Sequence, residues 1–298
     1  MAQALSVPEC LTLRDQLGPL PCERSCIAGL FPSYFEKGSP KGCWLAHTTL
    51  SLLEVLRIKE ALLHSHKRLS LEDVLLATLL HDIGKLTKDY LLEAYPYHNL
   101  LSAVIALKSL KSADIPVVDP LIIARAIFLH HEYRHWRSVF QAEYLNVHII
   151  DSIKKRKLRV IMAEGFEEPL EYLKEIIREE LRLRGALSPV LNNLIMQKEY
   201  RAKPEDYQKI ASISGGWSMV PKFLSLYWIL QLVDNRAASA REGANAYWAY
   251  RLARYKELSD KPCALARAIL DNDKKPHVLL TLIRPRKLRE EASRDDEL

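Results

Sequence analysis

The 298-residue sequence predicts an all-α protein, a bundle of helices around one core. Apolar residues recur at helical spacing, for instance through residues 71–79. Two such segments open with capping signals: Ser70 with Asp73 three residues later, and Asp119 immediately before Pro120. The sequence shows no alternation of strand-like and helix-like segments of the kind found in βαβ proteins. Helices therefore dominate the expected architecture.

The composition is that of a globular protein. Hydrophobic residues make up 48% of the chain and charged residues 27%, which is enough for one sizeable core. No run of about 18 apolar residues exists, and the first residues lack a basic segment followed by an apolar one. A cytoplasmic protein without a membrane span is expected. The net charge of +6 suits an anionic partner, and the excess of lysine, arginine and glutamate over asparagine and glutamine is common in thermophiles.

The first 43 residues are expected to form a loop-rich extension. Five prolines interrupt any long helix, and residues 31–42 resemble an exposed loop. Four of the five cysteines lie in this segment. A structural zinc, a disulfide and unremarkable thiols all remain open, although the spacing of Cys22 and Cys26 is not that of a usual zinc knuckle. Free or buried thiols are the favoured interpretation.

The remaining helices follow from their apolar spacing. Beyond about residue 260 the pattern changes, with a short strand or helix over 278–283 and a charged tail from 284 that is expected to be mobile. These changes predict domain boundaries at 1–43, 44–260 and 261–298. The predicted helices cover residues 47–62, 70–80, 98–107, 119–129, 166–184 and 223–239.

A His81-Asp82 pair at the end of the helix over 70–80 is the central motif. Neighbouring residues on a helix lie roughly 100° apart around its axis, so both side chains can hold one ion from different directions. The second oxygen of Asp82 can bridge to another ion. Lys85 follows His81 by one helical turn, where its ammonium can meet an anion bound at the metals. This is the outline of a phosphoester-cleaving site.

Other candidate ligands lie at or near the ends of apolar helices. Taken alone, His47 is more typical of a helix cap or a surface residue, and Asp234 in its apolar helix is ordinarily explained by a salt bridge with an arginine. Together, seven nitrogen and oxygen ligands from five helices can hold two divalent ions in the core of a bundle. The complete set is His47, His81, Asp82, His98, His130, His131 and Asp234.

In these motifs the chain resembles the HD-superfamily metal-dependent phosphohydrolases. Within that superfamily it most resembles the stand-alone HD nuclease of type I CRISPR interference, over roughly residues 44–245. The serine four residues after His98 favours this branch, whereas Ser239 falls one residue later than the family pattern. The matching elements are His47, His81-Asp82-Ile83-Gly84-Lys85, His98-Asn99-Leu100-Leu101-Ser102, His130-His131 and Asp234 with Ala237-Ala238-Ser239.

The resemblance implies two ions that share Asp82, with Lys85 contacting the scissile phosphate or its developing charge. The family cuts DNA, preferentially single-stranded, with ions such as manganese or magnesium; nickel, cobalt or iron are alternatives. A separate helicase subunit and an RNA-guided surveillance complex would supply the unwound strand, because this chain has no Walker-type phosphate loop. His135 is an alternative ligand for the second ion. The implied ligands are His47, His81, Asp82 and Asp234 for one ion, and Asp82, His98, His130 and His131 for the other.

Three rival functions stay open. Cyclic-dinucleotide phosphodiesterases share the His-Asp-Ile-Gly-Lys motif but carry a Gly-Tyr-Pro element that residues 132–137 lack. A nucleotide phosphohydrolase would use the same ions. A catalytically silent module would only bind a partner complex, which the presence of every ligand and of Lys85 argues against. The basic residues 154–159 and aromatic residues such as Trp44 and Trp217 favour a polymer weakly, since bases stack on such rings.

Overall fold

The computed structural model describes residues 7–24, 27, 29–65, 69–93, 98–113, 115, 119–130, 159–183, 185–211 and 220–240. These residues are mostly helical, which confirms the all-α prediction, and two short antiparallel strand pairs accompany the helices. The elements are α1 (Pro8–Leu17), η2 (Pro21–Arg24), β1 (Tyr34–Glu36), β2 (Ser39–Lys41), α2 (Trp44–Ser65), α3 (Leu71–Leu80), η3 (Ile83–Leu86), α4 (Lys88–Glu93), α5 (His98–Ser112), α6 (Pro120–Leu129), β3 (Arg159–Ile161), α9 (Glu167–Glu179), α10 (Leu187–Met196), β4 (Glu199–Arg201), α11 (Pro204–Ala211) and α12 (Val220–Ser239).

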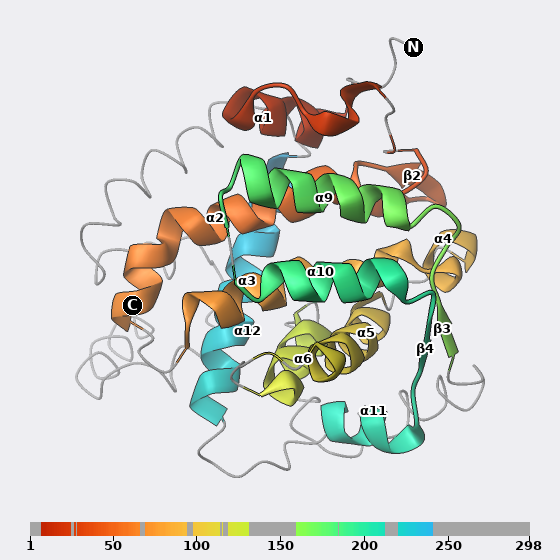
Figure 1. Cartoon of the computed structure of the whole chain (residues 1–298), viewed down its shortest axis with the longest axis vertical. Coiled ribbons are helices and arrows are strands. Elements are labelled where there is room, and N and C mark those ends of the chain that lie inside the picture. Colours follow the sequence, from red (N-terminus) through yellow and green to blue (C-terminus); the bar gives the residue numbers. More distant parts are fainter. Residues whose placement is uncertain are drawn as a thin grey trace, which may run out of the picture.

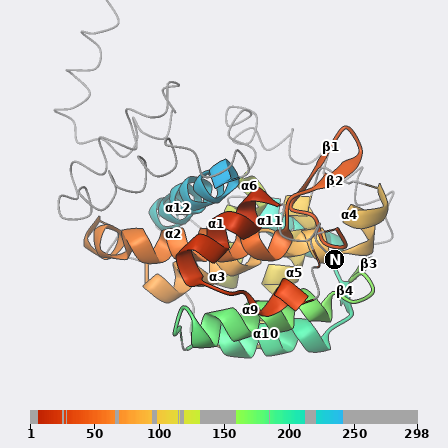
Figure 2. The same ribbon diagram turned by 90° about the horizontal axis from the view of Figure 1, so that it is seen from above.

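The helices lie in three layers. Figure 1 and Figure 2 together place α9 and α10 side by side on one face and α12 on the opposite face. Between these faces, α5 packs along α6 and α2 packs along α3. The helix α12 contacts α2, α3 and α6 directly. This arrangement brings the ends of several apolar helices together beneath α12.

Local capping chemistry sets two of the predicted helix starts. Ser70 and Asp73 form a reciprocal capping box, in which each side chain accepts a hydrogen bond from the backbone N–H of the other residue. The Asp119 side chain accepts from the backbone N–H of Leu121, and Pro120 takes the first helical position. Both predicted starts, of α3 and α6, are confirmed.

The N-terminal segment is more regular than a loop-rich extension. Pro8 occupies the first turn of α1, where its missing N–H is not needed, so this proline starts a helix instead of interrupting one. Leu13 and Phe31 are buried in the same core as the central helices. The residues expected to be a loop include the β1–β2 hairpin, whose exposed turn places Lys37 and Gly38 at positive φ. The domain boundary at residue 43 stays a prediction.

Several other features differ from the sequence prediction, and some predicted segments lie outside the described residues. α9 ends at Glu179 and not near residue 184. Arg182 has a left-handed backbone conformation (φ 51°), so the helix cannot continue through this residue. The helices α10 and α11 were not predicted; α10 begins without a side-chain cap, so its start carried no local signal. The expected element at 278–283, the charged tail, and residues 131–158 lie outside the described residues.

Two smaller expectations can be compared with the described part of the chain. There, none of the helices is long and apolar enough to cross a membrane. Cys10, Cys22 and Cys43 are buried thiols that form no disulfide, as favoured from the sequence. Cys26 and Cys263 lie outside the described ranges.

Candidate metal centre

Two apolar helices each end just before a histidine whose ring is oriented by the helix itself. Directly after the last residue of α3, the ring nitrogen Nδ1 of His81 lies 2.7 Å from the backbone carbonyl oxygen of Thr78. Behind α6, Nδ1 of His130 contacts the carbonyl oxygen of Ile127 in the same way. A carbonyl can only accept, so Nδ1 donates and Nε2 keeps the lone pair that a metal requires. The last carbonyl groups of a helix lack partners within it, and here they aim the two rings.

One oxygen of Asp82 faces a group contributed by α2, α3 and α12. Its Oδ2 lies 3.3 Å from His47 Nε2 and 3.4 Å from His81 Nε2. On the same side, Asp234 Oδ1 lies 3.0 Å from His47 Nε2 and 3.7 Å from His81 Nε2. All four residues are buried. Two imidazoles and two carboxylates from distant parts of the chain therefore share one small volume.

The other oxygen of Asp82 faces a second group, contributed by α5 and α6. Its Oδ1 lies 3.0 Å from His98 Nε2 and 3.9 Å from His130 Nε2. Within each of the two groups, the candidate ligand atoms all lie within 4.8 Å of one another. Neighbouring ligand atoms bound at about 2.1 Å from a shared ion lie roughly 3.0–3.4 Å apart, so each group needs to close only partly to hold one.

Buried atoms in this cluster fit a positive ion. Among the described residues, His81 Nε2 and Asp82 Oδ1 are buried without a hydrogen bond of suitable geometry. A buried polar atom left in this state costs free energy, and a divalent ion in each group would supply a partner: one for His81 Nε2 and the other for Asp82 Oδ1. Imidazole nitrogen with carboxylate oxygen is a donor set suited to first-row divalent metals. The structure brings together six of the seven predicted ligands; His131 and its alternative His135 lie outside the described residues.

The sequence matches the model of a known protein family. The HD domain model matches residues 49–213, more than half of the chain. The chain belongs to the HD domain family. HD domains are typically metal-dependent phosphohydrolases, and the buried histidine and aspartate cluster can bind divalent metal. Comparisons with curated proteins and with solved structures gave no match. The matched segment leaves out His47 and Asp234, which the fold nevertheless brings to the HD cluster.

The charges around the HD dipeptide set its protonation. Burial raises the pKa of Asp82, but the neighbouring His81, Lys85 and His98 outweigh burial and hold that pKa well below its ordinary value. Burial lowers the pKa of His81, but the carboxylates of Asp82 and Asp234 outweigh it and raise that pKa. The HD carboxylate is therefore ionised, and the HD histidine holds its proton more tightly than an isolated imidazole does.

The two histidines on the other oxygen of Asp82 are shifted in the opposite direction. Burial, followed by the charge of Lys85, lowers the pKa of His98. Burial lowers the pKa of His130 from 6.5 to about 3. These two rings are neutral at physiological pH, which is the form that binds a metal.

Lys85 lies inside the cluster. Its Nζ is 2.6 Å from Asp82 Oδ2, and the residue is 4% exposed. The sequence predicted that Lys85 would continue the helix of His81 by one turn, and this placement is wrong. α3 ends before His81, and residues 83–86 form the tighter turn η3, which returns the ammonium to the HD carboxylate.

Several residues that orient the HD segment were not recognised as such from the sequence. The indole N–H of Trp44 donates to the backbone carbonyl of Asp82 across 2.9 Å, and Trp44 is fully buried, so it is not a stacking platform. The backbone N–H of Gly84 donates to Ser102 Oγ across 2.8 Å. A Cβ atom at Gly84 would lie 2.3 Å from the carbonyl oxygen of His98, so only glycine permits this approach. The serine four residues after His98 was the available signal.

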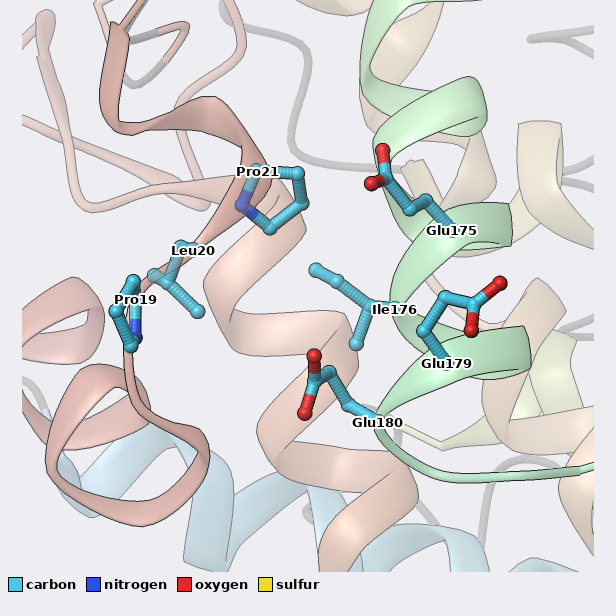
Figure 3. Close-up of a pocket in the computed structure, with 7 residues that line it drawn as sticks. All are labelled: Pro19, Leu20, Pro21, Glu175, Ile176, Glu179 and Glu180. Atoms are coloured by element: carbon cyan, nitrogen blue, oxygen red, sulfur yellow. The ribbon is translucent and has the colours of Figure 1, made fainter.

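A separate cavity of about 540 Å³ lies between the N-terminal segment and α9 (Figure 3). Its lining includes Pro19, Pro21, Ile176 and the carboxylates of α9 and the residue after it, and Figure 3 shows Glu180 facing the prolines. None of the candidate metal ligands lines this cavity. The cavity and the candidate metal ligands thus lie in different places in the described structure. We place the candidate functional site at the HD cluster, because its nitrogen and oxygen atoms can bind a metal.

Proposed function

We propose that this protein is a metal-dependent DNA nuclease that prefers single-stranded DNA and acts as the stand-alone HD nuclease of a CRISPR interference system. The observation that carries the proposal is the position of Asp82, whose two oxygens face two separate groups of ligand atoms. A pair of divalent ions, when bound, activates water and stabilises the attacking and leaving oxygens at phosphorus. This chemistry suits the phosphodiester bond.

The proposed ligand sets follow the two oxygens of Asp82. Manganese or magnesium is the proposed metal, with nickel, cobalt and iron as alternatives that imidazole nitrogen also accommodates. One ion would be held by His47, His81, Asp82 and Asp234, and the other by Asp82, His98, His130 and His131.

Lys85 supplies the positive charge that the chain itself contributes to the reaction. Its ammonium is buried beside Asp82, within the cluster where a phosphate group would bind. Attack at phosphorus increases the negative charge on the non-bridging oxygens, and a fixed cation next to them stabilises that charge. The stabilisation is larger in a buried site than in water, because the effective dielectric constant is lower. We therefore assign Lys85 to a non-bridging phosphate oxygen.

The position of the β1–β2 hairpin supports the proposal that the substrate is a polymer. Phe35 packs edge-on against Tyr90, with ring centroids 5.3 Å apart, and Tyr90 packs against His98 at 5.6 Å. These contacts fasten the hairpin beside one of the proposed ligands. Lys37 and Lys41 are exposed on it, where they can neutralise backbone phosphates next to the bond to be cut.

The proposed partners come from the resemblance to the CRISPR nuclease. A separate helicase subunit and an RNA-guided surveillance complex would present unwound DNA to the nuclease in the cytoplasm. Of the basic residues 154–159, which are candidates for guiding the strand, 154–158 lie outside the described part of the chain, and Arg159 is exposed on β3.

The deciding experiment compares cleavage of circular single-stranded DNA, duplex DNA, single-stranded RNA and a cyclic dinucleotide, each with added manganese or magnesium. The control is Asp82→Asn, which removes the charge but keeps the side chain's shape and an oxygen that can accept from the buried Lys85, whereas Asp82→Ala would leave Lys85 with no acceptor at this position. Cutting of the circle by the wild type alone supports the nuclease. Absence of any metal-dependent hydrolysis would instead indicate a silent module.

A phosphohydrolase acting on a cyclic dinucleotide or nucleotide is the second candidate. It is favoured by the burial of the cluster, in which His98, the most exposed of the described candidate ligands, is only 8% exposed. Hydrolysis of the small substrate with no effect on the DNA circle would select this function.

A further inference from the structure

A buried ion pair joins α2 to α12 close to the proposed metal centre. Arg236 Nη1 donates to Glu54 Oε2 across 3.1 Å, and these residues are 3% and 1% exposed. Glu54 follows His47 by seven residues, nearly two helical turns, so both lie on the same face of α2. Arg236 follows Asp234 by two residues on α12. The two helices are therefore joined twice, once by the His47–Asp234 contact and once by the Glu54–Arg236 pair.

The same carboxylate also holds a second guanidinium. Arg57 Nη1 donates to the other oxygen of Glu54, and Arg57 Nη2 donates to Gln16 Oε1 of α1 across 2.8 Å. Arg57 is partly exposed, whereas Arg236 is not. Arg236, the arginine two residues after Asp234, thus pairs with Glu54.

Fold stability alone does not explain this pair. Removing two charges from water costs free energy that offsets most of their attraction, so apolar side chains of similar size are often at least as stabilising. The neighbouring contact surface of α12 is apolar, with Leu226, Leu230 and Val233 fully buried. An apolar surface tolerates small rotations and shifts between helices, whereas a buried ion pair is satisfied in one arrangement only.

We propose that Glu54 and Arg236 are positioning residues that fix the rotation and register of α12 on α2, and so hold Asp234 Oδ1 beside His47 Nε2. A shift of α12 by one residue would turn Asp234 by about 100° and remove it from the cluster. The inference rests on the proposed function, because Asp234 requires this precision only as a metal ligand.

The test uses a set of variants that separates positioning from stability. Glu54→Leu with Arg236→Met replaces the pair by apolar side chains and leaves no buried charge at Arg236 or Glu54. Arg236→Lys keeps the charge but changes its geometry. Arg57→Met is the matched control, because it removes a guanidinium from the same glutamate without altering α12.

Two measurements are made on each folded variant. Ring ¹⁵N shifts of His47 in the metal-free protein, assigned with His47→Gln, report its contact with Asp234. Titration with Mn²⁺ reports metal affinity, and the Asp234→Asn variant identifies the binding step that involves this aspartate. Melting temperature is recorded alongside, so that a loss of fold is recognised.

We expect the double variant to melt within a few degrees of the wild type or above it, to show shifted His47 signals, and to lose at least tenfold in Mn²⁺ affinity at that step. Arg236→Lys should show His47 shifts and a loss of Mn²⁺ affinity between those of the wild type and the double variant. Arg57→Met should resemble the wild type. Unchanged His47 signals in the double variant would overturn the proposal, as would an equal effect of Arg57→Met. If the wild type binds no Mn²⁺, the proposed function fails, while the metal-free His47 spectra still decide the positioning role.

Discussion

The two sides of Asp82 differ in charge. The side facing α2 and α12 holds a second carboxylate, Asp234, beside His47 and His81, and the pKa of His81 is raised. The side facing α5 and α6 holds His98 and His130, whose pKa values are lowered. A metal therefore meets a ring that holds its proton tightly on one side, and rings that are already neutral on the other.

One buried carboxylate can thus serve two unlike sites. On the Asp234 side, a metal ion competes with a proton for His81, whose pKa is raised, so affinity there should rise with pH more steeply than on the His98 side. The carboxylate excess favours retention of a divalent ion once the proton has left. The two sides are thus expected to fill under different conditions although they share Asp82.

Removing the charge that both sides share should have the largest effect. We expect Asp82→Asn to bind neither ion at micromolar concentration and to lose at least about a thousandfold in metal-dependent hydrolysis, because each site loses its common anionic ligand. Metal content after dialysis and the rate on a small phosphodiester measure the two effects. Retention of one tightly bound ion in this variant would show that one side does not depend on Asp82.

One-sided changes should separate the two sites. Asp234→Asn and His98→Gln each replace one proposed ligand by a side chain of similar size. Each should weaken a different metal-binding step by about tenfold or more and leave the other step near its wild-type affinity. Calorimetric titration with Mn²⁺ resolves the steps. Loss of both steps in either variant would argue for a single shared site.

The sequence indicated the all-α fold and most of the side chains that meet around Asp82, but it did not indicate every helix. Each ligand motif was local: His81 and His130 end apolar helices, and the carbonyl groups at those helix ends orient their rings. The pairing of His47 with Asp234 was not local, since 187 positions separate them, and only the packing of α12 on α2 shows it. A resemblance to a known family supplied that contact in advance.

Some features had no local signal that could have predicted them. The 3₁₀ turn that returns Lys85 to Asp82 depends on the close approach of Gly84 to α5, which is a tertiary contact. The pairing of Glu54 could not be predicted from the sequence, because an isolated glutamate in an apolar helix pattern has many explanations. Its partner Arg236 lies 182 residues away.

The neutral side of Asp82 also predicts how the metal-free protein responds to acid. The pKa of His130 is lowered to about 3 in the folded state, while the unfolded chain takes up a proton near pH 6.5. Stability from this group is therefore complete above pH 6.5 and is lost as the pH falls toward 3, by an amount of a few kcal/mol. His98 acts with the same sign, whereas His81, with its raised pKa, opposes both.

The measurement is the free energy of unfolding in urea between about pH 6.5 and 5.5, above the range in which ordinary carboxylates titrate. His130→Gln should lower stability at pH 6.5 but flatten its dependence on pH, because the group whose pKa is lowered on folding is removed. A slope unchanged by this substitution would mean that His130 is not the group responsible.

The smallest expected effect lies outside both sites, on the hairpin beside His98. Reversing the charges of Lys37 and Lys41 to glutamate should raise KM for single-stranded DNA by about tenfold at low salt, because two phosphate contacts are lost and replaced by repulsion. The rate on a small phosphodiester should not change, since Asp82 and its ligands are untouched. Reversal of Lys59 and Lys174, which lie on the distal part of α2 and on α9, is the matched control. Equal KM values for the hairpin and control variants would remove the hairpin from the substrate path and leave the nuclease proposal to the metal centre alone.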